Sequence, residues 1–578
     1  MPSALQRFRP RVGGNRLQEQ AQLSQPELVS VRPTWGGYCP DLAPELTDWR
    51  DAAMMSGLVS IGGRLRSPPG FERLDPDSLP LGTNTPPAGA GNEEPVVGIY
   101  AYRDALVSGG TNRRYAVTAD DTLGHLYELS GNWTNIPAAA AAVLTGNTGG
   151  AGVAQTLADF ASFPTDNLII IANGFNVVFK HTPGGANYAE FSPAVLNPFI
   201  ARTVCTFADR ICFLNTSESG TVKPYRFRYT TTEASAPLTG SGSGFIDFLE
   251  VESEGTALRR LGNFLAAYFK RGTVLLRRTG DPQDPFRFDY ASTKRGVLGP
   301  FAVTDVGPGR HFGIFNDGWF YLEDDGQFTE VGLRSSDFGV NHKWKRTFYN
   351  NLNTEQAGRT FVQRDPLFDF YWILWADTTS DHPNRVWIYV PSIDAVFPQD
   401  GSYTTFPNVI ALSSTLSDTT RYADGAGLTY DQLTESYSNF EVKEGLDVVT
   451  YGTRTGLVLA EDPRLFKIDG VAPNYSHLAH PVPLGRPDLL KMADRTDVVY
   501  AQQAQTAPDI GVSMLIDENT FSQSIEQRIV APGTSVTDYV NFEETGALFA
   551  LGLAGQHPAE FITVQPHIRY TGGKVVKP

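Results

Sequence analysis

The sequence predicts a mainly β protein, a distorted β-propeller with an N-terminal extension and one or more additional β-sandwich-like domains. Composition is the first of three observations behind this prediction: the 578 residues include 56 glycines and 39 prolines, with 11% aromatic and only 19% charged residues. Such a chain favours strands linked by tight turns over long helices. The other two observations are a recurring turn-and-strand pattern in the middle of the chain and a strand-rich C-terminal segment.

Residues 1–95 are predicted to form an N-terminal extension and linker. The first 60 residues are polar and rich in Gln, Pro and Arg, with one short helix expected from Thr47 and Asp48 to Met55, because Thr47 or Asp48 would cap it. Residues 76–95 read PDSLPLGTNTPPAGAGNEEP and contain little to bury. That composition predicts a loop.

Residues 96–375 are predicted to form the main part of the propeller. A polar turn pair followed by a run of apolar residues recurs at 165–174, 208–215, 261–269 and 309–318. Equivalent positions (Asn167, Arg210, Asn263 and His311) are 43, 53 and 48 residues apart, and Phe370 in a further run lies 59 after His311. A period of about 40 to 50 residues is typical of propeller blades, although a long array of β-sandwiches would also produce it.

Asn173-Gly174 and Asp317-Gly318 are expected to form two-residue turns between adjacent strands. Residues 376–489 are predicted to be an insertion or a further propeller or tip region. Residues 490–578 contain the strand-like stretches 511–517, 547–553 and 561–564. They are expected to be a C-terminal β domain or the strands that close the propeller.

Net charge and cysteine content limit the function. The formal charge is −16, from 47 Lys and Arg against 63 Asp and Glu, so a DNA-gripping role is not expected, whereas DNA could slide past such a surface. Three cysteines cannot form a disulfide framework, which indicates assembly in a reducing cytoplasm. The longest apolar run, 138–144, is far shorter than the roughly 20 residues of a membrane helix, so membrane insertion is not expected.

Motifs for catalysis are missing from the sequence. It contains no HExxH, CxxC, GxxxxGK[ST] or GxSxG, and no GxGxxG between a strand and a helix, so we expect no enzyme, no cofactor and no metal site. Cys205 and Cys212 are interpreted as buried, inert thiols, and His477 with His480 as a loop pair. A glycosidase would need two carboxylates, and the acidic pairs 120–121 and 324–325 sit where hairpin turns are expected.

The order of several short segments resembles virion structural proteins of tailed bacteriophages, in particular the tail nozzle or tail hub of short-tailed phages. The segments are WGGY at 35–38, GGRLRSPPGF at 62–71, VGIYAY at 97–102, LYELSGNW at 126–133, DNLIIIANG at 166–174, GDPQDPFRF at 280–288 and FNDGWFY at 315–321. The resemblance covers scattered segments over about residues 30–340 and implies a distorted propeller that assembles as a ring. Residues 376–510 match nothing in this family.

The resemblance implies a homohexameric ring below the phage portal and adaptor, which forms and gates the channel for ejected double-stranded DNA. Partners would be adaptor and portal proteins and a tail fibre or spike, and the location would be the virion, after assembly in the host cytoplasm. Asp324 and Asp325 are candidates for the channel wall or gate. Arg64, Arg66 and Arg73 lie in a proline-stiffened ribbon that is either an inter-subunit contact or a surface turn before the first blade. The alternative function is a carbohydrate-binding or glycan-cleaving propeller for receptor recognition.

Overall fold

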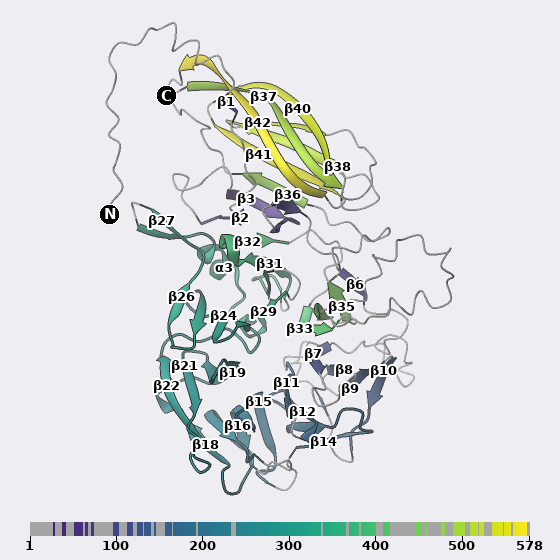
Figure 1. The fold of residues 1–578 in the computed structure, drawn as a ribbon, viewed down its shortest axis with the longest axis vertical. Coiled ribbons are helices and arrows are strands. Elements are labelled where there is room, and N and C mark those ends of the chain that lie inside the picture. The colour runs from purple at the N-terminus through teal and green to yellow at the C-terminus, as the bar shows by residue number, and fades with distance from the viewer. Residues whose placement is uncertain are drawn as a thin grey trace. The chain divides into compact units, whose positions relative to one another are not determined.

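The structure is a computed structural model, and it places the chain in two compact units (Figure 1). One unit comprises Pro69–Asp400 and Thr404–Leu465, and the other comprises Met1–Pro68, Gly401–Tyr403 and Phe466–Pro578. The residues that the structure describes are 27–28, 37–41, 51–61, 64–66, 71–73, 96–102, 113–119, 124–130, 132–139, 144–145, 157–163, 166–191, 195–232, 238–336, 339–365, 369–380, 383–399, 409–416, 447–453, 457–460, 475–479, 489–502, 509–517, 519–524, 535–546, 548–556 and 559–574.

The first unit is the predicted β-propeller, and six of its sheets each contain four antiparallel strands that are consecutive in the chain. The first three sheets are β7 (Val96–Tyr102), β8 (Arg113–Ala119), β9 (Gly124–Ser130) and β10 (Asn132–Ile136); β11 (Asp159–Phe163), β12 (Leu168–Ala172), β13 (Phe179–His181) and β14 (Tyr188–Glu190); and β15 (Phe199–Phe207), β16 (Arg210–Glu218), β17 (Thr221–Tyr229) and β18 (Gly244–Asp247).

The next three sheets follow the same order. They are β19 (Gly255–Leu261), β20 (Phe264–Phe269), β21 (Thr273–Arg278) and β22 (Phe286–Ser292); β23 (Val303–Gly307), β24 (Arg310–Ile314), β25 (Trp319–Glu323) and β26 (Phe328–Glu330); and β29 (Phe361–Arg364), β30 (Tyr371–Trp375), β31 (Arg385–Val390) and β32 (Ala395–Pro398). A hairpin of β27 (Leu333–Ser336) and β28 (Gly339–His342) and the short helix α3 (Lys345–Asn351) connect the last two of these sheets.

A seventh four-stranded sheet closes the ring with strands from two distant parts of the chain. It pairs β33 (Val409–Leu416), β34 (Asp447–Thr453) and β35 (Leu457–Ala460) with β6 (Phe71–Arg73) as its outer strand. Its first strand, β33, contacts both β7 and β29, and β11 contacts both β7 and β15. The first strand of each sheet therefore lies toward the centre of the ring and the fourth lies at the rim, as in a propeller.

The recurring apolar runs of the sequence are the second strands of successive sheets. Runs 165–174, 208–215, 261–269, 309–318 and 369–375 contain β12, β16, β20, β24 and β30. A second strand is covered on both faces by neighbouring sheets, so its side chains are buried throughout, as at Ile169, Ile170 and Ile171, which are 0 to 1% exposed. Each such side chain stabilises the fold by about 1.5 to 3 kcal/mol, which explains why these runs do not alternate with polar residues.

The expected two-residue turns were placed wrongly. Ile314 pairs with Trp319, so Asp317-Gly318 lies in a four-residue connection, and Asn173-Gly174 lies in the longer segment between β12 and β13. Asn173 accepts hydrogen bonds through Oδ1 from the backbone N–H groups of residues 175 and 176, which stabilises a wider turn. A two-residue turn does occur at Ala208-Asp209, where φ is 52° and 57°.

The second unit contains two six-stranded sheets. One sheet has the order β4 (Val59–Ile61), β5 (Arg64–Arg66), β42 (Ala559–Lys574), β37 (Leu489–Gln502) and β40 (Ser535–Gly546), with β1 (Glu27–Leu28) also on β42; the other has the order β2 (Gly37–Tyr38), β3 (Asp51–Ser56), β36 (Tyr475–Ala479), β41 (Phe549–Gln556), β38 (Asp509–Ile516) and β39 (Asn519–Ser524). The predicted C-terminal strands fall in β38, β41 and β42, but each sheet also contains strands from the N-terminal segment.

Two local predictions in this unit were wrong. The helix expected to end at Met55 is strand β3 over residues 51–56, which pairs with β2 and β36; residues 47–50 lie outside the described residues. Pairing on both sides buries Ala52 and Met55 while Met54 is 65% exposed, so sheet packing outweighs the local capping preference. His477 lies in β36 and not in a loop, and His480 lies outside the described residues.

The contact-based units differ from the predicted domain ranges. The propeller unit begins at Pro69, whereas the prediction began it at residue 96. Within the range 376–489, Gly401–Tyr403 and the residues after Leu465 belong to the second unit, and the rest belongs to the propeller unit. Among the described residues, no helix has both the length and the apolar character needed to cross a bilayer.

Candidate functional site

Asp324 and Asp325 lie in the turn that joins β25 and β26, the two outer strands of the fifth sheet. The Asp325 carboxylate accepts a hydrogen bond from the Gln327 backbone N–H at 2.9 Å, and Gly326 adopts a φ of +84°. Both features stabilise a tight turn. The other acidic pair, 120–121, lies outside the described residues.

Arg64, Arg66 and Arg73 lie on strands that belong to different units. Arg64 and Arg66 are the ends of β5, which pairs with β4 and β42 in the second unit. Arg73 is the last residue of β6 and pairs with Val458 in the closing sheet of the propeller. The ribbon is therefore two separate strand pairings and not a single turn, and its predicted contact with another subunit stays a prediction.

Cys205 and Cys212 are free thiols at directly opposed positions of β15 and β16. Burial raises the pKa of Cys205 to about 11, and it raises that of Cys212 well above its usual value. These thiols have the properties of buried structural cysteines. Within the part of the chain that the structure describes, no three His, Cys, Asp or Glu residues gather in a way that could hold a metal ion.

The best candidate site is a cavity of about 870 Å³ on one face of the propeller. Residues from five sheets, the second to the sixth, form its wall. They lie mostly at the ends of the second strands of these sheets and at the starts of the first strands. The lining includes Gly174 and Phe175, residues 200, 202, 215–217 and 222, residues 254–256 and 270, 297–300 and 316, and 354, 355, 357 and 358. Segments far apart in the sequence thus converge on one hollow, which is the usual place for a ligand site.

Arg202 is the cation of this cavity that lacks a hydrogen bond or ion pair with the described residues. It lies on β15, is half-buried, and makes no hydrogen bond or ion pair with any residue that the structure describes. Burial lowers the pKa of its guanidinium, and the negative charges of Glu254 and Asp159 oppose this effect. A Cβ on Gly174, where φ is +74°, would lie 2.8 Å from Arg202 Cδ, so this glycine leaves room for the arginine side chain.

The other charged residues of the cavity are Lys270, Glu254 and Glu355. Lys270 Nζ lies 2.5 Å from Glu254 Oε1, an exposed ion pair at the wall. Asn215 projects from a β-bulge in β16 and donates from Nδ2 to the Gly255 carbonyl at 3.0 Å, which ties the third sheet to the fourth.

A smaller cavity of about 200 Å³ lies among the first strands, at the centre of the ring. An ion pair lines it: Arg259 Nη1 lies 3.0 Å from Asp159 Oδ2. Asp159 also accepts hydrogen bonds from the Thr203 hydroxyl and the Val204 backbone N–H, and Arg259 donates to the Pro300 carbonyl at 2.9 Å. Because Pro300 also lines the larger cavity, this network joins the centre of the ring to the cavity wall.

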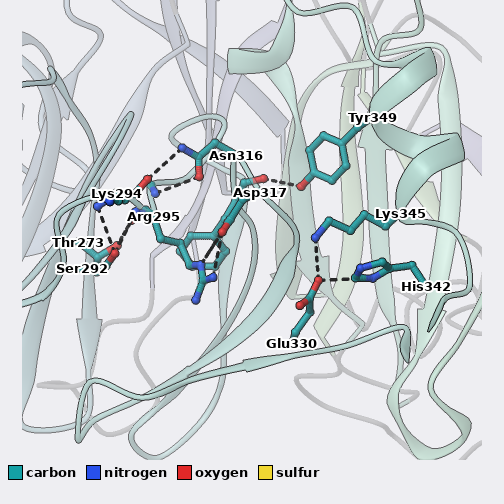
Figure 2. A network of polar contacts seen from close by, with 12 residues as sticks. Thr273, Ser292, Lys294, Arg295, Asn316, Asp317, Glu330, His342, Lys345 and Tyr349 are labelled. Carbon is teal, nitrogen blue, oxygen red and sulfur yellow. Dashed lines mark hydrogen bonds and ion pairs between the residues drawn. The ribbon is translucent and has the colours of Figure 1, made fainter. Parts of the chain in front are cut away.

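Beside the cavity, a polar network surrounds the connection between β24 and β25, and Figure 2 shows its side chains. Arg295 contacts both carboxylate oxygens of Asp317 at 2.9 to 3.1 Å and stacks over the Phe320 ring at 3.8 Å. On the other side in Figure 2, Glu330 Oε1 lies 2.9 Å from Lys345 Nζ and 3.5 Å from His342 Nδ1.

This network borders a second hollow of about 390 Å³, lined by residues 316, 317, 342, 345, 346 and 349. Tyr349 donates its hydroxyl to the Phe315 carbonyl, and burial, with the charges of Asp317 and Glu330, raises its pKa well above the usual value. Asn316 lines both this hollow and the main cavity. Arg295 is paired with Asp317 and Lys345 with Glu330, so these two ion pairs hold the rim in shape.

Sequence reasoning did not identify Arg202, Glu355 or the cavity. The one signal was an arginine inside the otherwise apolar and hydroxylic strand FIARTVCTF at 199–207. The sequence alone does not show that this arginine lines a cavity, because that requires knowing that the strand is the first of its sheet and lies toward the centre of the ring.

Comparisons with known proteins give little beyond the fold. No family model and no curated protein matches the chain. A structural match is the crystal structure of the WD40 beta propeller domain of Doa1, with a TM-score of 0.31 and 10% identity, covering 64% of this chain and 93% of that one. At this level of similarity the match carries no functional argument, and the order of the sheets itself defines this unit as a β-propeller.

Proposed function

We propose that the protein is a non-catalytic structural component of a bacteriophage tail. In this proposal six copies form a nozzle or hub ring below the portal and adaptor, and the ring forms and gates the channel through which double-stranded DNA leaves the virion. The ring would also carry a tail fibre or spike protein. The resemblance of the segments between residues 30 and 340 suggested this role.

The observation that carries the proposal is the way in which the chain links its two units. The chain leaves the second unit at Pro68, forms the rim strand of the closing sheet at Phe71–Arg73, and returns to the second unit at Gly401–Tyr403 and again after Leu465. The chain thus passes between the two units several times, and one of these passages adjoins the strand that closes the propeller. Such a design suits a part that must withstand the pressure of a packaged genome.

The charge balance also supports the proposal. A net charge of −16 is unfavourable for a protein that retains DNA and suitable for one that DNA must pass without adhering. The acidic side chains at 324 and 325 stay candidates for a channel-facing surface of the assembled ring, since they lie at the rim of the propeller and not at its centre.

Electron microscopy and mass measurement of the purified chain, alone and mixed with the adaptor ring, test the proposal. The expected result is a closed ring of six subunits of 63.2 kDa each. Arg73→Glu should weaken this ring if the predicted inter-subunit contact exists, whereas Arg278→Glu, at a site 61% exposed on β21, serves as the matched control. A chain that stays monomeric with the adaptor and is absent from tailed particles would overturn the proposal.

A second candidate is the carbohydrate-binding or glycan-cleaving propeller, because the main cavity presents hydroxyl and amide side chains beside two carboxylates, Glu254 and Glu355. No tryptophan is among its lining residues in the described part of the chain. A glycan array with the purified protein tests this candidate. Binding to no glycan, together with no release of sugar from any of them, would exclude it.

A further inference from the structure

The main cavity of the propeller contains one cation that has no direct hydrogen bond or ion pair with the residues that the structure describes. Arg202 makes no hydrogen bond or ion pair with the residues that the structure describes, although it lines a hollow of about 870 Å³. The neighbouring cation, Lys270, differs because it lies 2.5 Å from Glu254. The guanidinium is half-buried and faces the cavity, so a ligand with suitable acceptors can take the place of the water that solvates it.

The shape of the arginine site is maintained by the surrounding backbone. Gly174 leaves space beside Arg202 Cδ that a larger residue would fill, and Gly174 N donates to the Ala201 carbonyl at 2.8 Å, next to the arginine in β15. The side chain is therefore confined by the connection that follows β12. A confined guanidinium loses less conformational freedom when it binds a planar anion.

The charges around the site favour a carboxylate over a phosphate. Glu254 and Glu355 also line the cavity, and a dianion would be repelled by both of them. A carboxylate carries a single charge and matches the fork of a guanidinium with two parallel hydrogen bonds. Arg202 and Lys270 together balance the two glutamates, so one added negative charge is the most that the cavity accommodates without further cations.

The rest of the lining suits hydroxyl groups. The Ser217 hydroxyl, the Thr354 hydroxyl and the Glu355 carboxylate line the cavity and have no hydrogen-bond partner among the described residues. Phe175, which is 43% exposed, presents part of its ring at the same wall. Hydrogen-bonding groups beside an apolar ring face are the features that bind a sugar.

We propose that this cavity binds a sugar acid, with the carboxylate of the ligand on Arg202 and its hydroxyl groups on the other polar residues of the lining. This inference goes beyond the proposed structural role and does not depend on it, since it needs only the propeller face. A tail protein with such a site would contact an acidic surface glycan as well as its protein neighbours.

The test is calorimetry and ligand-observed NMR on the full-length chain with glucuronate, glucose, acetate and inorganic phosphate as probes. Glucose lacks the carboxylate of glucuronate, and acetate lacks its hydroxyl groups. We expect glucuronate to bind at least tenfold more tightly than each of the other three. Equal binding of glucose and glucuronate, equal binding of acetate, or tighter binding of phosphate would each overturn the proposal.

Variants test the assignment of the residues. Arg202→Gln should weaken glucuronate binding at least tenfold, Arg202→Lys should recover part of the loss, and Ser217→Ala should weaken glucuronate without affecting acetate. Arg278→Gln, which alters an exposed arginine away from the cavity lining, should leave binding unchanged. Thermal unfolding curves of all four variants identify any that fail to fold. Unchanged binding in a folded Arg202→Gln variant would refute the site.

Discussion

Replacing Asp159 should cost the propeller more stability than breaking an exposed ion pair of the same unit. Its side chain is 6% exposed and lies 3.0 Å from Arg259 at the centre of the ring. Asp159→Ala removes this ion pair together with the acceptor for the Thr203 hydroxyl and the Val204 N–H. Because Arg259 would then keep a positive charge in a largely enclosed space, the expected loss of unfolding free energy is about 3 to 5 kcal/mol.

The measurement is urea unfolding followed by tryptophan fluorescence, which reports mainly on the propeller because six of the eight tryptophans lie within residues 69–465. The double variant Asp159→Ala/Arg259→Met removes the stranded charge, so it should regain part of the stability that the single variant loses. Glu323→Ala breaks an exposed ion pair with Arg310 at the rim, with side chains 36 and 40% exposed, and should cost only about 0 to 1 kcal/mol. The ion-pair interpretation would be refuted if Asp159→Ala lowered the free energy of unfolding by less than about 1 kcal/mol. It would also be refuted if the double variant lost as much stability as Asp159→Ala and Arg259→Met lose together.

Three further predictions follow from other parts of the propeller. Burial lowers the pKa of His311 to about 4. Its neutral ring accepts a hydrogen bond from the Tyr268 hydroxyl and donates one to the Arg260 carbonyl. The contribution of His311 to the free energy of unfolding is therefore complete above pH 6.5 and is lost as the pH falls toward 4. Urea midpoints at pH 7 and pH 5 should therefore differ less in His311→Gln than in the wild type, and an equal difference would contradict the assignment. The pKa of Cys205 is raised to about 11 from 9, so less of it is thiolate at pH 8, and it should react with iodoacetamide about 100-fold more slowly than an unperturbed thiol. Fast labelling of Cys205 in the native protein would contradict its burial. The double variant Glu72→Pro/Arg73→Pro removes one hydrogen bond between β6 and β35 whichever way the strand faces, so the propeller should lose about 0.5 to 1.5 kcal/mol in the same urea assay. No change would mean that the closing strand is dispensable.

The second strands of the sheets were predictable because a strand that is buried on both faces is apolar throughout, whatever the sequence of the neighbouring sheet. An apolar run such as Leu168–Ala172 needs no knowledge of its partners, and the turn before it supplies the boundary. The spacing of these runs then predicted blades of the right size. The first and fourth strands have mixed burial and left no comparable pattern, as in β22, where only Phe286 is fully buried.

The closing sheet and the cavity could not be predicted for a different reason. The strand β6 is three residues long and pairs with β35 about 385 positions later, so neither segment carries a local sign of its partner. The cavity collects residues from five sheets, and a polar residue on any one of them resembles an ordinary surface residue. Arg202 acquires its meaning only from the neighbours that the ring brings to it.

The position of β6 also constrains how the chain can reach its folded state. Each of the first six sheets pairs strands that follow one another in the chain, so these sheets can form from local hairpins. The seventh sheet requires Phe71–Arg73 to stay available until residues up to Ala460 are present, because Ala460 pairs with Phe71. Ring closure is therefore the last step in the propeller, and it also fixes where the chain enters from the second unit. Between the seventh and first sheets, a ring completed in this way is held by the pairing of β6 with β35 and by the contact of β33 with β7.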